Sequence, residues 1–216
     1  MKRQPLFLAM HAAMRDALGP GRWWPDASPF EIAVGSILTQ NVSWENVERA
    51  MANLKAGGEF TAEALLALPV EELARLIRPV RYFQVKAARL RNLLALIVHD
   101  LGGDLTALAR MDLETARQTL LAVRGVGPET ADKILLFALG LPSFVVDAYT
   151  VRVCGRHALL AEDAGYGEVR EMFMDALPED PALFAEYHEL LARVGNAWCK
   201  PKAPRCATCP LAAFLP

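Results

Sequence analysis

A glycine turn and one acidic residue are the most chemically informative features of this 216-residue chain. Gly125 and Gly127 lie between two stretches with helical apolar spacing, and Asp147 opens another such stretch about twenty residues later. Bare backbone amides at the start of a helix bind anions, and a DNA phosphate is one such anion. A fixed carboxylate stabilises the positive charge that develops on a sugar when its glycosidic bond breaks. The pattern therefore predicts chemistry on a nucleotide, with Thr130 starting the helix after the turn. Asp147 also suits a helix N-cap, and the two roles are compatible.

The elements that must position these residues are helices. Ser28-Pro29-Phe30-Glu31 is a capping box with proline at the first helical position, and it predicts a helix running to about Thr39. Apolar spacing predicts a helix at the N-terminus, another after Ser43, and further helices near 62–67, 70–77, 84–101, 112–122, 128–139, 148–160, 167–176 and 180–197. Because strand-like alternation is nearly absent, the predicted fold class is all-α.

Composition limits the possible partners and compartment. The net charge is −2 and the hydrophobic content is 53%, and no run of 18 apolar residues suggests a membrane span. An acidic chain that binds DNA needs a local basic face. The densest basic run comprises Arg75, Arg78, Arg81, Lys86, Arg89 and Arg91. Four cysteines without secretory features predict a reducing compartment and metal ligation rather than disulfides.

Three motifs resemble the endonuclease III superfamily of DNA repair glycosylases. GVGPETA resembles its helix-hairpin-helix signature, and VVDAY resembles the loop that ends in its catalytic aspartate, here Asp147. GSILTQNVSWENVERAMANL is similar to the segment whose glutamine, here Gln40, fills the gap left by an extruded base. CKPKAPRCATCPL resembles the iron–sulfur loop of these enzymes. The resemblance covers roughly residues 20–216, and the three motifs follow in the family's order.

The resemblance implies a two-lobed helix-hairpin-helix glycosylase fold with a DNA-binding cleft between the lobes. One lobe is expected to be a six-helix bundle over residues 25–140, with the helix-hairpin-helix at about 112–139. Residues 1–24 and 141–216 are expected to form the second helical lobe, with Asp147 and a cysteine loop at 199–209. The implied partner is double-stranded DNA containing damaged bases. We expect a cytoplasmic, nucleoid-associated monomer that does not contact a membrane.

The hairpin departs from the bifunctional members of the family at one residue. Those members carry a lysine two residues after the second glycine, where this chain has Glu129. A carboxylate cannot form a Schiff base. Lys133 lies one helical turn further on, and we interpret it as a residue that faces solvent or a DNA phosphate. The substitution predicts a monofunctional glycosylase, which leaves the abasic site uncut.

Aromatic residues indicate the substrate. The triplet Trp23-Trp24-Pro25 and Trp44, four residues after Gln40, resemble the 3-methyladenine glycosylases of this superfamily, which sandwich the flipped base between rings. Ring faces attract cations by roughly 0.5–2 kcal/mol, and an alkylated purine is cationic. Core packing is the alternative explanation for each tryptophan. Tyr82 aligns with the loop that supplies the family's second wedge, and packing on the bundle is its alternative role.

The cysteine loop lacks part of the family's ligand set. Cys199, Cys206 and Cys209 match three positions of the [4Fe–4S] site, but Leu215 stands where the fourth cysteine is expected. Cys-ligated clusters need four ligands. We expect a cluster with an unidentified fourth ligand. Zinc and a metal-free loop remain open. Cys154 is interpreted as a small buried hydrophobe.

Two other interpretations stay open. One is an endonuclease III-type glycosylase and lyase for oxidised pyrimidines, with Lys133 as its amine. The other is a non-catalytic module that binds damaged DNA. The motif His188-Glu189 starts like a zinc-protease signature, but Ala192 stands where the second histidine would be. His188 is therefore expected to pack or to form a hydrogen bond.

Overall fold

A computed structural model describes residues 3–21, 24, 26–40 and 42–216 of the chain. Every regular element within these residues is a helix, so the all-α prediction is confirmed. The chain divides into two compact units, one of Asp26–Leu139 and the other of Met1–Pro25 with Gly140–Pro216. None of the helices in the described part is long and apolar enough to cross a membrane.

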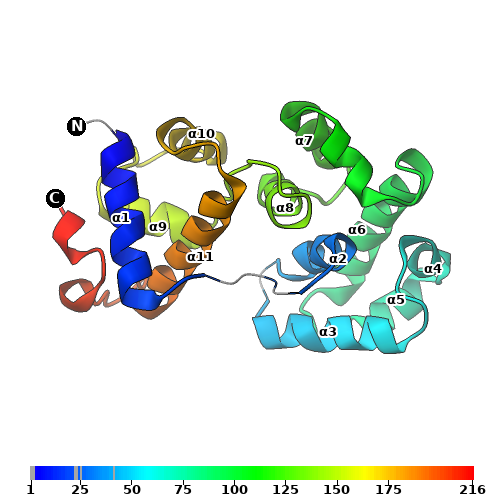
Figure 1. Ribbon diagram of the computed structural model, residues 1–216. Coiled ribbons are helices and arrows are strands. Elements are labelled where there is room, and N and C mark those ends of the chain that lie inside the picture. Colours follow the sequence, from blue (N-terminus) through cyan, green and yellow to red (C-terminus); the bar gives the residue numbers. More distant parts are fainter. Residues whose placement is uncertain (1–2, 22–23, 25, 41) are drawn as a thin grey trace. The chain divides into compact units, whose positions relative to one another are not determined.

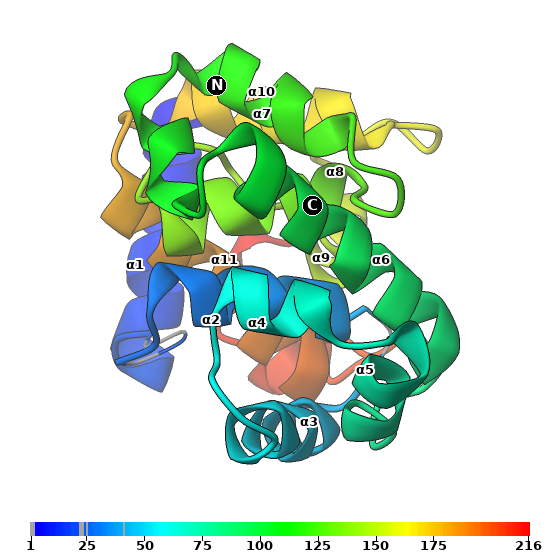
Figure 2. The same ribbon diagram turned by 90° about the vertical axis from the view of Figure 1, so that its right-hand side faces the viewer.

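The unit Asp26–Leu139 contains the turn with Gly125 and Gly127 (Figure 1). Its helices are α2 (Pro29–Leu38), α3 (Trp44–Ala56), α4 (Ala62–Ala67), α5 (Val70–Leu76), α6 (Phe83–Ala95), α7 (Leu113–Leu121) and α8 (Pro128–Lys133). A 3₁₀ segment, η2 (Leu105–Arg110), precedes α7. Helices α4 and α5 pack against α6, and α2 packs against the segment that continues α8 (Figure 2).

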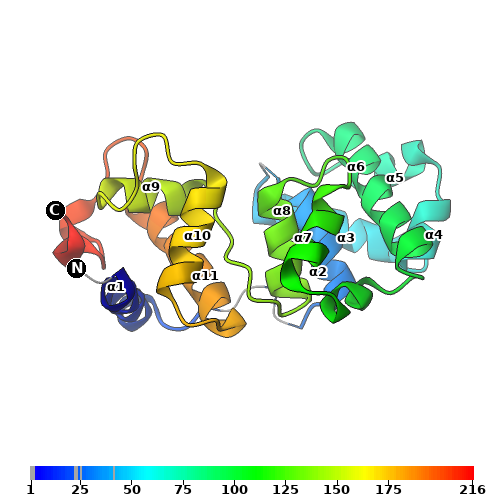
Figure 3. The ribbon, with the colours of Figure 1, turned by 90° about the horizontal axis from the view of Figure 1, so that it is seen from above.

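The second unit contains Asp147. Its helices are α1 (Arg3–Leu18), α9 (Ala148–Arg156), α10 (Tyr166–Ala176) and α11 (Pro181–Ala197). Two short 3₁₀ segments, η4 (Cys206–Thr208) and η5 (Ala212–Phe214), end the chain. Helices α1 and α9 pack against α11, and α1 also contacts α10 (Figure 3).

The capping box at the start of α2 is confirmed. The Ser28 amide donates to Glu31 Oε2 at 2.7 Å, and the Glu31 amide donates to Ser28 Oγ at 3.2 Å. The helix is buried on almost every side, which agrees with its apolar sequence from Ile32 to Leu38. Its C-terminal end leads directly into Gln40.

An aromatic cluster forms the core of the unit that carries Asp147. The Phe144 and Phe173 rings stack with centroids 4.0 Å apart and an interplanar angle of 3°. Phe7 lies 4.9 Å from the Phe173 ring, and the hydroxyl of Tyr187 donates to the Phe7 carbonyl at 3.1 Å. Offset aromatic pairs add to the free energy gained by burial. This core ties α1, α10 and α11 to the segment that leads to Asp147.

The helix boundaries differ from the predictions in two ways. The predicted helices near 84–101 and 128–139 both end in π-helical turns, η1 (Leu96–Asp100) and η3 (Ile134–Ala138). Such turns follow no apolar repeat, so the pattern could not distinguish them from α-helix. The helix after Asp147 ends at Arg156 rather than near 160, because Ala158 takes up a left-handed conformation with φ +53°.

Candidate functional site

Asp147 caps α9 through its side chain. Its Oδ1 atom accepts hydrogen bonds from the Thr150 amide at 2.8 Å and from Thr150 Oγ1 at 3.0 Å. The backbone of Asp147 is extended, as is usual for an N-cap. These two bonds fix the rotamer of the carboxylate, which is only half-buried.

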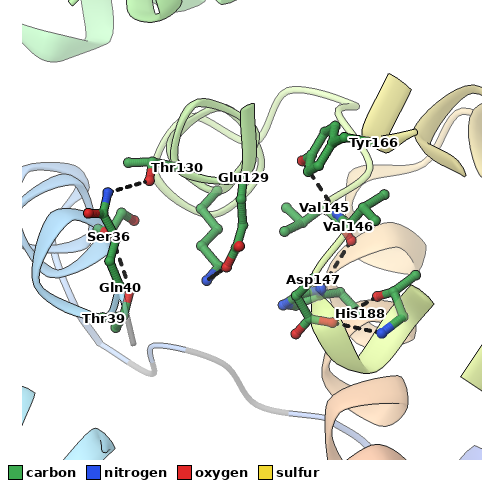
Figure 4. A network of polar contacts seen from close by, with 12 residues as sticks. Ser36, Thr39, Gln40, Glu129, Thr130, Val145, Val146, Asp147, Tyr166 and His188 are labelled. Atoms are coloured by element: carbon green, nitrogen blue, oxygen red, sulfur yellow. Dashed lines mark hydrogen bonds and ion pairs between the residues drawn. The ribbon is translucent and has the colours of Figure 1, made fainter. Parts of the chain in front are cut away.

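The segment before Asp147 is held by two side chains of its own unit. The ring nitrogen Nδ1 of His188 lies 3.1 Å from the Val145 carbonyl oxygen, and the Val146 amide donates to the Tyr166 hydroxyl at 3.4 Å (Figure 4). Val145 and Val146 are buried, and His188 is 1% exposed. The hydrogen bond expected of His188 is confirmed. Neither its link to the Asp147 loop nor the role of Tyr166 could be predicted, because no local pattern joins these residues.

The hairpin needs glycine at its first position for two reasons. Gly125 has φ +100°, which side-chain-bearing residues rarely adopt. A Cβ atom there would also overlap the side chain of Arg89. A Cβ atom on Gly127 would meet no atom within 4 Å, so that face of the backbone is open. Gly127 is the N-cap of α8, and Pro128 occupies the first helical position.

A buried ion pair braces the hairpin from inside. Arg117 on α7 donates to Asp132 on α8 through Nε at 2.9 Å and Nη2 at 3.3 Å. The Asp132 side chain is 0% exposed. A two-pronged contact of this kind fixes both distance and angle between its partners. The two helices that flank the glycines are thereby held together.

The residue at the family's lysine position pairs with the nearest amine. Glu129 Oε1 accepts from Lys133 Nζ at 2.7 Å, one helical turn away. The Lys133 side chain is 13% exposed, so much of its stem is covered. Lys133 therefore contacts a carboxylate and is mostly covered, so of the two predicted roles, facing solvent or facing a DNA phosphate, the first is not supported.

Gln40 lies close to the hairpin. Its Nε2 atom donates to Thr130 Oγ1 at 2.9 Å, which joins two residues that are 90 positions apart in the chain (Figure 4). Both residues belong to the same compact unit. Two motifs identified separately in the sequence thus meet at one place.

Tyr82 is exposed rather than packed on the bundle. Its side chain is 59% accessible, its backbone is left-handed with φ +58°, and it is the N-cap of α6. The Arg81 guanidinium lies 4.9 Å from the centre of its ring. An aromatic ring with this exposure, beside a cation, is available for contact with another molecule.

The basic run does not form a continuous charged surface. Lys86 is 2% exposed and donates to main-chain carbonyls, while Arg89 donates to Gln40 Oε1. Arg91 donates to the Leu68 carbonyl at 2.5 Å, and Arg75 pairs with Glu72. Lys86 is therefore not part of an exposed basic face, whereas Arg75, Arg78 and Arg81 are exposed.

The predicted aromatic residues lie in different parts of the chain. Trp44 is the first residue of α3, with 43% of its surface exposed. Trp24 has a left-handed backbone with φ +54° and is half-buried, in the segment between α1 and α2. Trp23 and Pro25 lie outside the described residues, so the triplet is described only in part.

Cys199, Cys206 and Cys209 line one small pocket, together with Arg156, Trp198 and Leu215. The Arg156 Nη1 atom donates to Cys199 Sγ at 2.7 Å. Burial is the main cause of a raised pKa at Cys209, which disfavours its thiolate. Within the described residues, no group of three or more Cys, His, Asp or Glu residues is arranged to hold a metal ion. The predicted [4Fe–4S] site is not confirmed: the donor set does not fit a four-thiolate cluster, because the fourth position is apolar.

Comparisons with known proteins agree on one family. The family model described as "HhH-GPD superfamily base excision DNA repair protein" matches residues 34–179. A putative DNA repair glycosylase of Methanocaldococcus jannaschii is 41% identical over 95% of this chain and 93% of its own length. Endonuclease III of Bacillus subtilis is 29% identical over 86% of this chain and 80% of its own length.

Two solved structures have the same fold. A non-covalent endonuclease III–DNA complex matches with a TM-score of 0.82 and 23% identity, over 100% of this chain and 95% of the other. The H. pylori 3-methyladenine DNA glycosylase bound to 1,N6-ethenoadenine matches with a TM-score of 0.77 and 24% identity, over 91% of this chain and 98% of the other. At these identities the likeness extends to the fold alone.

Proposed function

Because this chain belongs to the HhH-GPD superfamily of base excision DNA repair proteins and is a DNA glycosylase of that superfamily, we propose that it is monofunctional and releases alkylated purines such as 3-methyladenine. Water then replaces the base at the sugar, and the abasic strand stays intact. Asp147 is the proposed catalytic residue. Its carboxylate is held by Thr150, so it needs little reorganisation when the sugar becomes positively charged.

The Glu129–Lys133 ion pair is the observation that carries the monofunctional mode. A lyase needs a neutral amine that attacks the sugar carbon and forms a Schiff base. Glu129 has no such nitrogen. Lys133 forms an ion pair with Glu129, and a lysine ammonium in an ion pair has no lone pair for attack.

The substrate class rests on Trp44. Trp44 leaves 43% of its surface exposed at the start of α3, and a cation can stack on the face of a tryptophan ring. A cationic purine gains by stacking on that face, and its glycosidic bond already breaks readily, so no strong general acid is required. Trp23, Trp24 and Pro25 are the proposed further members of the base pocket. The H. pylori 3-methyladenine DNA glycosylase, which has the same fold, supports this choice.

The remaining proposed DNA contacts divide into two kinds. Gln40 and Tyr82 fill the space left by the extruded base, as befits a half-exposed amide and an exposed ring. The second kind is contact with a phosphate through the backbone amides of the hairpin, which contains Gly125, Gly127 and Thr130. Lys133 lies on α8, the same helix as Thr130. We propose residues 25–140 as the lobe with the hairpin, and residues 1–24 with 141–216 as the lobe with Asp147.

Two alternatives remain distinguishable. A glycosylase and lyase for oxidised pyrimidines is favoured by the similarity to endonuclease III. The second alternative is a binding module without chemistry. The contacts of Asp147 do not favour it, since a pure binder does not need a fixed carboxylate. No step of the proposed reaction passes through an iron–sulfur cluster.

The decisive experiment combines two readouts on one sample. The protein is incubated with methylated duplex DNA, released bases are identified by mass spectrometry, and the strands are separated with and without alkali. We expect 3-methyladenine, with nicks only after alkali. Nicks without alkali would support the lyase. Absence of both, on this duplex and on duplexes carrying other lesions, would leave the binding module.

A further inference from the structure

Both ends of the Gln40 side-chain amide are bonded to other helices. Nε2 donates to Thr130 Oγ1 on α8 at 2.9 Å, and Oε1 accepts from Arg89 Nη1 on α6. The amide oxygen accepts from a guanidinium, and the amide nitrogen donates to a hydroxyl oxygen. This orientation is favoured, because flipping the amide would place its NH2 group against the guanidinium, and both groups are donors. The side chain is half-buried, so part of it remains open to another molecule.

The backbone of Gln40 is held separately, by Lys86. The buried Nζ atom of Lys86 donates to the Leu38 carbonyl at 2.6 Å and to the Gln40 carbonyl at 2.8 Å. Leu38 is the last residue of α2 and Gln40 lies two residues beyond it, where carbonyl groups lack helical partners. Lys86 thus fixes the turn from which Gln40 projects.

The same face of α6 also contacts the hairpin. Arg89 lies against Gly125, where a Cβ atom would overlap its side chain. One turn further along, Asn92 Nδ2 donates to the Arg124 carbonyl at 2.8 Å. Successive turns of α6 therefore hold the Gln40 turn and the glycine hairpin in one register.

We propose that Lys86, Arg89 and Thr130 are positioning residues that hold Gln40 in its inserting geometry before DNA binds. This inference rests on the proposed gap-filling role of Gln40. A side chain held in one conformation loses less conformational entropy on binding than a mobile one. The contacts of these three residues with Gln40 therefore raise the affinity for DNA that offers a gap. In this proposal the contacts remain in place on DNA, because the amide keeps a second N–H donor and a second acceptor lone pair for the DNA.

The test uses a duplex that contains a gap but no base to release. A tetrahydrofuran abasic analogue provides it, and the measured quantity is the ratio of dissociation constants for undamaged and tetrahydrofuran duplexes. Gln40→Ala lowers this ratio. Thr130→Val and Arg89→Met each lower it by about threefold to tenfold, the effect of one hydrogen bond. Thr130→Ser keeps its hydroxyl and keeps the ratio. Arg89→Met retains the part of the side chain that packs on Gly125. It therefore tests the proposal even if Thr130→Val folds poorly.

A double-variant cycle separates positioning from general support. Thr130→Val has no further effect in the Gln40→Ala background if it acts through Gln40. Thr119→Val is the matched control, since the hydroxyl of the half-buried Thr119 donates to the Thr115 carbonyl of its own helix. An unchanged or higher ratio in Thr130→Val, an equal loss in both backgrounds, or no loss in Gln40→Ala would overturn the proposal. Because no base is released from this duplex, failure of the alkylated-purine proposal would appear only in the base-release assay.

Discussion

Lys133 Nζ lies 2.7 Å from Glu129 Oε1 on the helix that follows the hairpin. The two residues occupy consecutive turns of one helix face, so the pair forms without distortion. The amine one helical turn after the family's lyase position is thus held in an ion pair by Glu129, the residue that stands in place of the lysine.

Glu129→Lys should create strand-cleaving activity. The change places an amine at the family's position and removes the partner of Lys133. Borohydride trapping of a covalent protein–DNA complex is the measurement, and the wild-type protein should give none. Glu129→Gln is the control, because it releases Lys133 without adding an amine at 129. Trapping by the wild-type protein or by Glu129→Gln would identify Lys133 as a nucleophile.

Asp147→Asn should reduce single-turnover base release by roughly 100-fold to 1000-fold, the usual cost of a lost electrostatic contact to the transition state. Asparagine also caps helices, so stability should change little. Asp112→Asn is a matched control, since Asp112 caps α7 by accepting from the Thr115 amide at 2.9 Å. Equal rates of base release in the two variants would mean that Asp147 only caps α9 and is not catalytic.

Trp44→Ala should lower kcat/KM for methylated DNA by about twofold to thirtyfold, which is the range of one cation–π contact. Trp44→Phe retains an aromatic face and should recover most of the loss. The discriminating comparison is with a neutral substrate base, which gains less from the ring. A loss of the same size for neutral and cationic bases would contradict the stacking argument.

Lys86→Met should change how stability depends on pH. Burial, with a smaller contribution from Arg89, lowers the pKa of Lys86 from 10.5 to about 8. Between these values the unfolded chain holds a proton that the folded chain has released, so this group makes the free energy of unfolding rise with pH. The neutral amine keeps two N–H groups for its two carbonyls. Denaturant unfolding from pH 7 to pH 10 should show a smaller rise in Lys86→Met, while Lys202→Met, at an exposed lysine, should match the wild type.

The cysteine loop should keep its structure without iron. Arg156 donates to Cys199 Sγ and, at 3.3 Å, to the Lys200 carbonyl, and Arg152 donates to the Cys199 carbonyl at 2.5 Å. These contacts hold Cys199 and Lys200, at the start of the loop, through two arginine side chains. We expect anaerobically purified protein to contain well under four iron atoms per chain, by metal analysis, and Cys206→Ser to retain base release. Stoichiometric iron that is lost in Cys206→Ser would refute this.

Local sequence patterns were sufficient to predict where most helices lie and to find the residues of each motif in the chain. The Ser28–Glu31 capping box, the cap at Asp147 and the proline after Gly127 depend on neighbours within a few positions, which the chain order supplies directly. The sequence alone also shows that Glu129 stands in place of the family's lysine, because this requires only the alignment of the hairpin motif. The all-α class followed from apolar spacing, since a repeat of 3.6 leaves no alternating strand pattern.

Only the tertiary structure decided what several of these side chains contact. Lys86 belongs to a basic run by sequence, yet its amine is buried against carbonyls 46 and 48 positions away. Gln40 meets Thr130 across 90 positions, and Arg156 reaches Cys199 across 43. Such partners are set by which helix faces pack together, and that depends on the shape and burial of the whole core rather than on any local repeat. Charge and residue type thus predicted the chemistry available, while packing determined which groups were left to perform it.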